Sequence, residues 1–212
     1  MNVVDFISQK RLVAVIRLPD LSTATALSRA LIAGGVCALE FTLTNRDSID
    51  VIRRLRDELP EVANGEAVIG AGTVTSVEDA RLSMQAGAQF IVSPTTKVSV
   101  IDACKEGGVP IMPGAYTPTE IEAAWDAGAD VVKVFPATTL GPGYIKAVLA
   151  PLPHLKLLPT GGIDHTNMAD YLNSGVIAVG VGGNLLDKKA IAAGDWEAIQ
   201  ATAQQYAHLA TR

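Results

Sequence analysis

Residues 76–93 read SVEDARLSMQAGAQFIVS. In the first part of this stretch, apolar residues recur at three- and four-residue spacing after Ser76, which predicts a helix with Ser76 as its capping residue. The small residues AGA at 86–88 predict a turn, because glycine takes the left-handed conformation that stops a helix. QFIVS at 89–93 has the short apolar and β-branched character of a strand. The stretch therefore predicts one helix–turn–strand unit.

The same unit recurs along the chain. Helical patterns also cover residues 22–35, 47–59, 97–108, 117–128 and 164–175, with predicted starts at Ser22, Thr117 and Asp164 for three of them, and most end in a small-residue turn. Eight strand candidates accompany them: LVAVIR (12–17), CALEFTL (37–43), AVIGAGT (67–73), QFIVS (89–93), VPIMPG (109–114), DVVKVF (130–135), LKLLPT (155–160) and VIAVGVGG (176–183). Helices alternating with almost wholly apolar strands predict a parallel sheet covered by helices.

Eight such units in 212 residues favour a closed (β/α)8 TIM barrel. An open doubly wound sheet is the alternative, but the first strand is not followed by the GxGxxG pattern of a dinucleotide site. The chain contains no linker and no low-complexity tract that would divide it. We therefore expect one α/β domain, a single barrel over residues 1–212.

Composition narrows the class of partner. The chain is 49% hydrophobic and 18% charged with a formal net charge of −5, so it can bury a large core. Its basic residues are mostly single, apart from the pairs at 10–11, 53–54 and 188–189, and they form no basic stripe of the kind that binds nucleic acid. A small-molecule partner is the better expectation.

Metals and membranes are not indicated either. Cys37 and Cys104 match neither a disulfide framework nor a metal-binding spacing, and the histidines are scattered. The amino-terminal residues carry Asp5 where a signal peptide would be basic, and no run approaches the about 18 apolar residues of a membrane-spanning helix. We expect a cytoplasmic protein that has no metal site and does not bind a membrane.

A lysine stands in the middle of the sixth predicted strand, DVVKVF. Strand alternation puts Lys133 on one face with Val131 and Phe135, and barrel enzymes carry their chemistry at the carboxyl ends of such strands. A buried ammonium tends to lose its proton, and a neutral amine can form a Schiff base with a ketone. The alternative is a structural ion pair with Glu40 that only joins two strands.

Glu40 interrupts CALEFTL as Lys133 interrupts DVVKVF, which suggests a nucleophile and its proton shuttle at one barrel mouth. Arg17 ends the first strand and suits a carboxylate, to which Thr73 and Thr160 could also donate hydrogen bonds.

Glycine clusters follow the seventh and eighth strands, in PTGGI (159–163) and GVGGN (180–184). Loops at these two positions of a barrel commonly bind phosphate through backbone amides, although tight turns at the rim would also use glycine. The candidate catalytic residues are thus Lys133 and Glu40. The candidate substrate-binding residues are Arg17, Thr73, Pro94, Phe135, Thr160, Gly161, Gly162, Gly182, Gly183 and Asn184.

Seven blocks in order, EFTLTN (40–45), GAGTV (70–74), VSP (92–94), PIMPG (110–114), VKVFPA (132–137), GPGYIKA (141–147) and PTGGI (159–163), give the chain a family likeness. The chain resembles the 2-keto-3-deoxy-6-phosphogluconate (KDPG) aldolases, a family that includes the 4-hydroxy-2-oxoglutarate (KHG) and 2-keto-3-deoxy-6-phosphogalactonate aldolases. The resemblance implies a class I aldolase on a (β/α)8 barrel, a homotrimer that needs no cofactor or metal.

The resemblance also implies residue roles. Lys133 matches the Schiff-base lysine and Glu40 the proton-transferring glutamate, while Arg17 and Thr73 match positions that hold the pyruvate carboxylate. Two positions depart from the family pattern. Thr44 stands where some members have an arginine for the pyruvyl end, and Asn184 stands where some have a serine. The choice between phosphorylated and unphosphorylated substrates stays open at this point.

The implied reaction is cleavage of KDPG to pyruvate and D-glyceraldehyde 3-phosphate, with KHG cleavage to pyruvate and glyoxylate as a second activity. A phosphogalactonate aldolase and an oxaloacetate decarboxylase are alternatives, because the same iminium ion serves both. A barrel that binds phosphate without catalysis, with Lys133 in a structural role, is the alternative from a different class.

Overall fold

The computed structural model describes residues 2–211. Within them, the structure has nine short parallel strands. They are β1 (Leu12–Ile16), β2 (Ala38–Thr42), β3 (Val68–Gly72), β4 (Ile91–Val92), β5 (Ile111–Met112), β6 (Gly114–Ala115), β7 (Val132–Val134), β8 (Leu157–Pro159) and β9 (Val179–Val181). Each of the eight predicted strand segments contains at least one of them.

The fifth predicted strand is split in two, as β5 and β6. Pro113 lies between them, and proline has no N–H group to donate to a neighbouring strand. The Pro113 carbonyl still accepts a hydrogen bond of 2.9 Å from the backbone N–H of Lys133. The interruption therefore leaves the chain aligned beside β7.

The strands form a curled parallel sheet. One sheet has the order β5-β4-β3-β2-β1-β9 and a second has the order β6-β7-β8. Backbone hydrogen bonds link the two at both ends: Asp130 N–H donates to the Ile111 carbonyl at 3.1 Å, and Ile177 N–H donates to the Leu157 carbonyl at 3.2 Å. A parallel bridge also joins Thr160 to Gly180. The carboxyl ends of all strands consequently lie on one side of the molecule.

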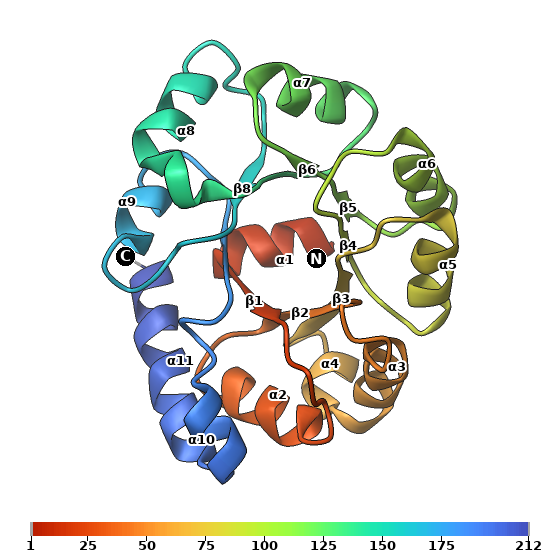
Figure 1. Cartoon of the computed structure of the whole chain (residues 1–212), viewed down its shortest axis with the longest axis vertical. Helices are drawn as coiled ribbons and strands as arrows, with labels where there is room; N and C mark the ends of the chain where they lie inside the picture. Colours follow the sequence, from red (N-terminus) through yellow and green to blue (C-terminus); the bar gives the residue numbers. More distant parts are fainter. Residues whose placement is uncertain (1, 212) are drawn as a thin grey trace.

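Helices surround the strands, as Figure 1 shows. They are α1 (Val3–Lys10), α2 (Ala24–Ala33), α3 (Ser48–Glu58), α4 (Pro60–Ala63), α5 (Val77–Gln85), α6 (Val98–Glu106), α7 (Pro118–Asp126), α8 (Gly141–Leu149), α9 (Met168–Leu172), α10 (Lys188–Ala193) and α11 (Trp196–Ala210), with a 3-10 turn at Ala137–Thr139. In the view of Figure 1, α1 lies across the middle of the ring and the others lie around it.

The predicted turns and caps can be checked one by one. Gly87, in the AGA turn of residues 86–88, has φ of 92°, and Ser76 accepts a hydrogen bond from Asp79 N–H at 3.0 Å, so both predictions are confirmed. The predicted helix start at Asp164 is wrong. Its carboxylate accepts hydrogen bonds from the backbone N–H and hydroxyl of Thr166, which holds a turn, and α9 begins only at Met168.

The start predicted at Ser22 is also displaced, because α2 begins at Ala24 and its N-cap, Thr23, makes no side-chain capping bond. By contrast, Thr117 forms a complete capping box with Glu120 at the start of α7, as predicted.

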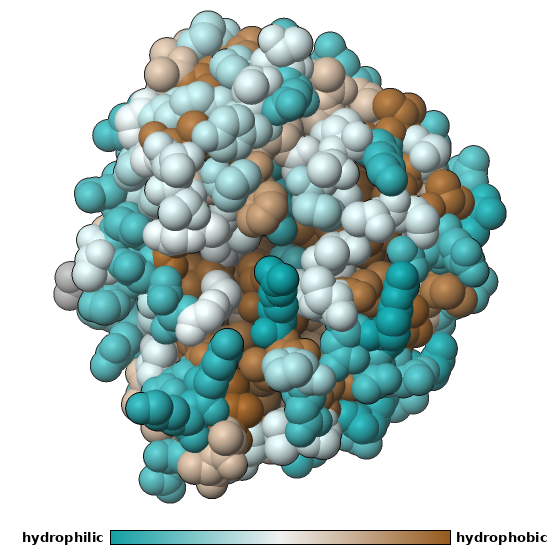
Figure 2. All heavy atoms as spheres, in the orientation of Figure 1, coloured by the Kyte–Doolittle hydropathy of each residue, from teal (hydrophilic) through white to brown (hydrophobic). Residues whose placement is uncertain are grey.

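The core occupies the interior of the strands and the layer between strands and helices. All five residues of β2 and of β3 are buried, as expected for strands covered on both faces. Hydrophilic side chains cover most of the face shown in Figure 2, with hydrophobic atoms visible between them. Among the helices within residues 2–211, none combines the length and the apolar character needed to cross a bilayer.

Candidate active site

Two ionisable side chains meet inside the curled sheet. Lys133 comes from β7 and Glu40 from β2, and their side chains are only 7% and 2% exposed. The Lys133 Nζ lies 4.0 Å from Glu40 Oε1, which is longer than a hydrogen bond but within reach of electrostatic attraction. Strand alternation explains both positions, because the neighbours of each residue face the opposite side of the sheet. The amine and the carboxyl group are thus close without being locked together.

Glu40 occupies an environment that disfavours its charge. Burial raises the pKa of the Glu40 carboxyl above its ordinary value of 4.5, and the nearby Lys133 ammonium acts in the opposite direction. Its Oε1 atom is buried and has no hydrogen-bond partner among residues 2–211. Gly72 of β3 provides the space for the carboxyl group, since a Cβ atom at that position would overlap Oε1. A buried acid of this kind is suited to donating and accepting a proton.

Phe135 covers the amine. Its ring centroid lies 5.0 Å from the Lys133 Nζ, in the range of a cation–π contact, and 36% of the residue is exposed. Phe135 lines two cavities. The aromatic ring therefore stands between the buried amine and the solvent.

The first of these cavities, of about 230 Å³, lies at the loops after β8 and β9. The loop after β8 contributes Gly161 and Gly162, whose φ values of 101° and 72° favour glycine. The lining residues are Val15, Arg17, Leu18, Phe135, Thr160, Gly161, Gly162, Ile163, Gly180, Gly182, Gly183, Asn184, Leu186 and Lys188. None of them is acidic, and two are cationic. We call this space the glycine cavity.

Two threonines of the predicted site have unusual local features. Thr73 directly follows β3 and has φ of 59°, a left-handed conformation that is rare for a β-branched residue. The hydroxyl oxygen of Thr160 is buried without a hydrogen-bond partner among residues 2–211, and Gly180 provides the space for it. Strained backbones and unpaired buried polar atoms both occur more often at functional sites than elsewhere.

Asn184 connects the two glycine loops. Its side-chain amide donates to the Ile163 carbonyl at 3.1 Å, and its own carbonyl accepts a hydrogen bond of 3.4 Å from the Tyr206 hydroxyl. The side chain is therefore used to hold the loop after β9 against the loop after β8.

The second cavity beside Phe135 measures about 290 Å³. It is lined by Pro94, Thr95, Thr96, Gly114, Ala115, Tyr116, Glu120 and Phe135. Pro94 packs closely on β6, because a Cβ atom at Gly114 would overlap its carbonyl group. The Glu120 carboxylate is engaged, since it accepts hydrogen bonds of 2.8 Å from the backbone N–H groups of Tyr116 and Thr117.

A third cavity of about 490 Å³ lies at the ends of β1 and β2 and is lined by Arg17, Leu18, Pro19, Thr44, Asn45 and Arg46. The Thr44 hydroxyl lies 2.8 Å from that of Thr42, so it turns toward the strand. Arg46 is paired with Asp79 at 2.5 Å.

The structure thus brings most of the predicted site residues together. The glycine cavity is lined by Arg17, Phe135, Thr160, Asn184 and the four predicted glycines. Pro94 lines the second cavity, which also includes Phe135. Thr73 lines neither cavity, although it follows the Gly72 that accommodates Glu40. Lys188 also lines the glycine cavity and was not predicted. Its only sequence signal is its membership of one of three pairs of adjacent basic residues.

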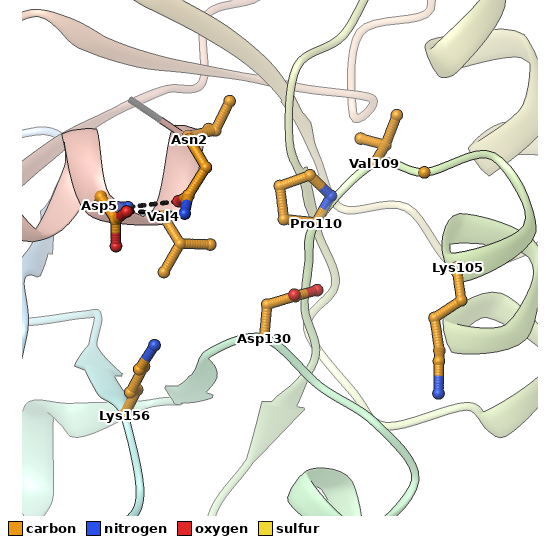
Figure 3. Close-up of a pocket in the computed structure, with 10 residues that line it drawn as sticks. Asn2, Val4, Asp5, Lys105, Val109, Pro110, Asp130 and Lys156 are labelled. Atoms are coloured by element: carbon orange, nitrogen blue, oxygen red, sulfur yellow. Dashed lines mark hydrogen bonds between the residues drawn. The ribbon is translucent and has the colours of Figure 1, made fainter.

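A larger cavity, of about 670 Å³, lies at the amino-terminal side of the strands, beside α1. Figure 3 shows Asn2 and Asp5 of this region, joined by hydrogen bonds, facing Pro110, Asp130 and Lys156, with Lys105 farther away on α6. Its lining mixes lysines with aspartates and so has no preference for one charge. Barrel chemistry is found at the opposite ends of the strands, where Lys133 and Glu40 lie.

Within residues 2–211, no group of three or more His, Cys, Asp or Glu side chains is arranged to hold a metal ion.

Fold and site together describe a parallel α/β enzyme with a lysine amine among the carboxyl ends of its strands. The sequence profile of the KDPG and KHG aldolases matches residues 3–202. The chain belongs to the KDPG and KHG aldolase family, whose named members are carbon–carbon lyases.

Individual proteins show how far the similarity extends. The chain is 38% identical to a 2-dehydro-3-deoxy-phosphogluconate aldolase of Treponema pallidum, over 97% of this chain and 96% of that one. It is 36% identical to the KHG/KDPG aldolase of Escherichia coli, over 91% and 89%. The KDPG aldolase of Legionella pneumophila, solved with pyruvate captured as a covalent carbinolamine, superposes with a TM-score of 0.86 at 29% identity, over 96% and 97%.

Proposed function

We propose that this protein is a class I aldolase that cleaves KDPG to pyruvate and D-glyceraldehyde 3-phosphate through a Schiff base on Lys133. The observation that carries the proposal is the buried Lys133 Nζ, 4.0 Å from a buried carboxyl group of raised pKa. The covalent carbinolamine of the Legionella pneumophila relative supports the same kind of intermediate.

The first half of the reaction builds the electron sink. The unprotonated amine of Lys133 attacks the C2 carbonyl of the substrate to give a carbinolamine. Glu40 donates a proton to the carbinolamine hydroxyl, which leaves as water, and an iminium ion remains. Because burial keeps the Glu40 carboxyl protonated to higher pH than an exposed one, it has a proton to donate.

The second half of the reaction breaks the C3–C4 bond and releases the two products. The ionised Glu40 accepts the proton of the C4 hydroxyl as the C3–C4 bond breaks, and the electron pair moves to the iminium nitrogen. The aldehyde product departs and an enamine of pyruvate stays on Lys133. The protonated Glu40 then gives its proton to C3, and water hydrolyses the resulting iminium ion to free pyruvate and the amine. No oxidant, reductant, cofactor or metal ion takes part.

The other residues would hold the two ends of the substrate. Phe135 and Pro94 would form walls beside the amine, and Thr73 is proposed to donate to the keto acid end. The family resemblance implies that Arg17 holds the pyruvate carboxylate, whereas its place in the glycine cavity favours a contact with the distal phosphate. The backbone N–H groups of the loops after β8 and β9 would bind the same phosphate.

KHG is the second proposed substrate, cleaved to pyruvate and glyoxylate by the same steps. The relatives named KHG/KDPG aldolase favour it. The phosphogalactonate aldolase and oxaloacetate decarboxylase activities remain alternatives, since both would use the same iminium ion. A pyruvate-release assay with KDPG, the phosphogalactonate analogue, KHG and oxaloacetate separates them. The proposal requires that kcat/KM be highest for KDPG. A higher kcat/KM for any other substrate would make that compound the preferred substrate instead.

For the architecture, we propose one (β/α)8 barrel domain across residues 1–212. The hydrogen bonds at 111–130 and 157–177, together with the Thr160–Gly180 bridge, support closure of the sheet, with β5 and β6 counted as one strand. We also propose a cytoplasmic homotrimer, on the basis of the family resemblance. Light scattering tests the assembly: it should give three times the chain mass of 22.1 kDa, and a monomer would contradict it.

A further inference from the structure

The glycine cavity combines two cations with no acidic residue, in a protein whose net charge is −5. Arg17 reaches the cavity from the end of β1, and Lys188 reaches it from the first residue of α10. The electrostatic potential of the cavity therefore favours an anion, although the protein as a whole disfavours one.

Lys188 is not occupied elsewhere. Its side chain is exposed, and no hydrogen bond or ion pair joins its ammonium group to any other side chain among residues 2–211. The nearest acid in the sequence, Asp187, accepts hydrogen bonds from the backbone N–H groups of Lys189 at 2.7 Å and Ala190 at 3.3 Å. That carboxylate is committed to the start of α10, which leaves the Lys188 ammonium available to a ligand.

The loop that carries Lys188 is well anchored. Leu185 and Leu186 are buried, and their backbone N–H groups donate to the carbonyls of Gly182 at 2.9 Å and Gly183 at 3.3 Å. Asn184 is tied to the Ile163 carbonyl, as described above. Lys188 thus follows directly on a fixed turn, so its position at the rim of the cavity is maintained by buried leucines and backbone hydrogen bonds.

Asn184 and Lys188 have different roles at the glycine cavity. The Asn184 side chain holds the loop after β9 in place, because one of its amide N–H groups donates to the Ile163 carbonyl. The cavity nevertheless needs positive charge to favour a dianion over a singly charged or neutral group, and an amide supplies none. Arg17 supplies one positive charge, and Lys188, four residues after Asn184, supplies a second.

We propose that Lys188 is a specificity-determining residue, whose ammonium group contacts the terminal phosphate and favours phosphorylated over unphosphorylated keto acids. The inference rests on the proposed aldolase function. To that function it adds Lys188 as a binding residue and selection of the substrate by charge. A phosphate monoester carries about −1.5 to −2 charges at pH 7, so it gains more from a second cation than the single carboxylate at the end of KHG does.

The test compares Lys188→Gln with Lys189→Gln, which makes the same charge change one residue away at an exposed lysine outside the cavity lining. For Lys188→Gln we expect kcat/KM for KDPG to fall about tenfold at low ionic strength, through KM, and kcat/KM for KHG to stay within about twofold. The inhibition constant of inorganic phosphate should rise about tenfold as well. Lys189→Gln should change none of these values, and Lys188→Arg should recover most of the loss.

Two outcomes would overturn the inference: an unchanged ratio of kcat/KM for KDPG and KHG in Lys188→Gln, or an equal loss in Lys189→Gln. Borohydride trapping of pyruvate separates this failure from failure of the aldolase proposal. If Lys188→Gln and the unmodified protein are both trapped at Lys133 but the ratio is unchanged, only the role of Lys188 is refuted. If the unmodified protein is not trapped, the aldolase mechanism itself is wrong.

Discussion

Gly72 leaves the space that the carboxyl group of Glu40 occupies. The two residues lie on neighbouring parallel strands, where Thr42 is the partner of Gly72, and the Glu40 side chain leans along β3 toward it. A side chain at position 72 would displace the carboxyl group from its place 4.0 Å from the Lys133 amine. A residue without a side chain thereby sets the geometry of the catalytic pair.

Gly72→Ala should therefore reduce kcat by at least about tenfold, since small displacements of a catalytic group are costly. Gly143→Ala is the matched control, because a Cβ atom there meets nothing within 4 Å. It should leave kcat unchanged and, in a helix, raise the free energy of unfolding by up to about 1 kcal/mol. Steady-state kinetics and thermal unfolding measure both.

A double variant keeps this prediction testable if Gly72→Ala folds poorly. Combining Gly72→Ala with Glu40→Ala removes the overlapping carboxyl group, so the pair should be more stable than the sum of the two single effects. Wild-type turnover in a folded Gly72→Ala protein would show that the space at Gly72 has no bearing on catalysis.

Glu40→Gln should lower kcat by about 10²- to 10⁴-fold, the usual contribution of a positioned acid or base. The amide keeps the shape of the side chain but cannot move a proton. Lys133 should still be modified by pyruvate and borohydride, only more slowly. Turnover within a factor of about two of the unmodified protein would reject Glu40 as the proton shuttle.

The stability of Glu40→Gln relative to the unmodified protein should depend on pH. The folded-state pKa of Glu40 is raised by burial, so the folded protein binds more protons than the unfolded one between the ordinary value of 4.5 and the raised value. Stability contributed by the protonated carboxyl group is therefore lost as pH rises through this window. The glutamine of Glu40→Gln cannot ionise. The free energy of unfolding of this variant, relative to that of the unmodified protein, should therefore increase from pH 4 to pH 8.

Glu122→Gln, at an exposed position of α7, is the control for this measurement, and its difference from the unmodified protein should vary much less with pH. Denaturant unfolding at several pH values gives both differences. If the Glu40→Gln difference is the same at pH 4 and pH 8, Glu40 does not titrate abnormally.

The sequence predicts part of the fold and part of the candidate site, as particular residues show. Lys133 and Glu40 were found because a charge in an otherwise apolar strand has few structural explanations, and the turn glycines because they end a periodic pattern. Pro113 lies inside the predicted strand VPIMPG, but its missing N–H group divides β5 from β6. Asp164 has the side chain of a helix cap, but an aspartate that accepts a hydrogen bond from the residue two positions ahead makes a turn equally well.

Contacts between residues that closure of the sheet brings together could not be predicted from the sequence. Arg17 meets the glycine loop after β9 because β1 pairs with β9, with Ala14 opposite Val181. These segments are separated by most of the chain, and no local pattern reports their contact. Lys188 was missed for the same reason. A pair of basic residues in a sequence does not reveal which one faces a cavity.

Thr160→Val should separate stability from activity. Among residues 2–211, the buried Thr160 hydroxyl oxygen has no hydrogen-bond partner. Removing it therefore breaks no hydrogen bond among these residues and should leave the free energy of unfolding equal or up to about 1 kcal/mol higher. If the hydroxyl donates to the substrate, kcat/KM should fall about tenfold.

Ser83→Ala provides the comparison, because Ser83 on α5 also has a buried hydroxyl with no hydrogen-bond partner in the described part of the chain and lies outside the glycine cavity. It should keep full activity. Unchanged kcat/KM in Thr160→Val would mean that this hydroxyl plays no part in substrate binding.

The central claim is that Lys133 forms a Schiff base with the keto acid. Treating the protein with pyruvate and borohydride, followed by peptide mass spectrometry, tests it most directly. We predict one reduced pyruvate adduct, on Lys133, that depends on pyruvate and is absent from Lys133→Met, with the exposed Lys146 unmodified. An unmodified Lys133, or an adduct that persists elsewhere in Lys133→Met at the same rate, would contradict the mechanism.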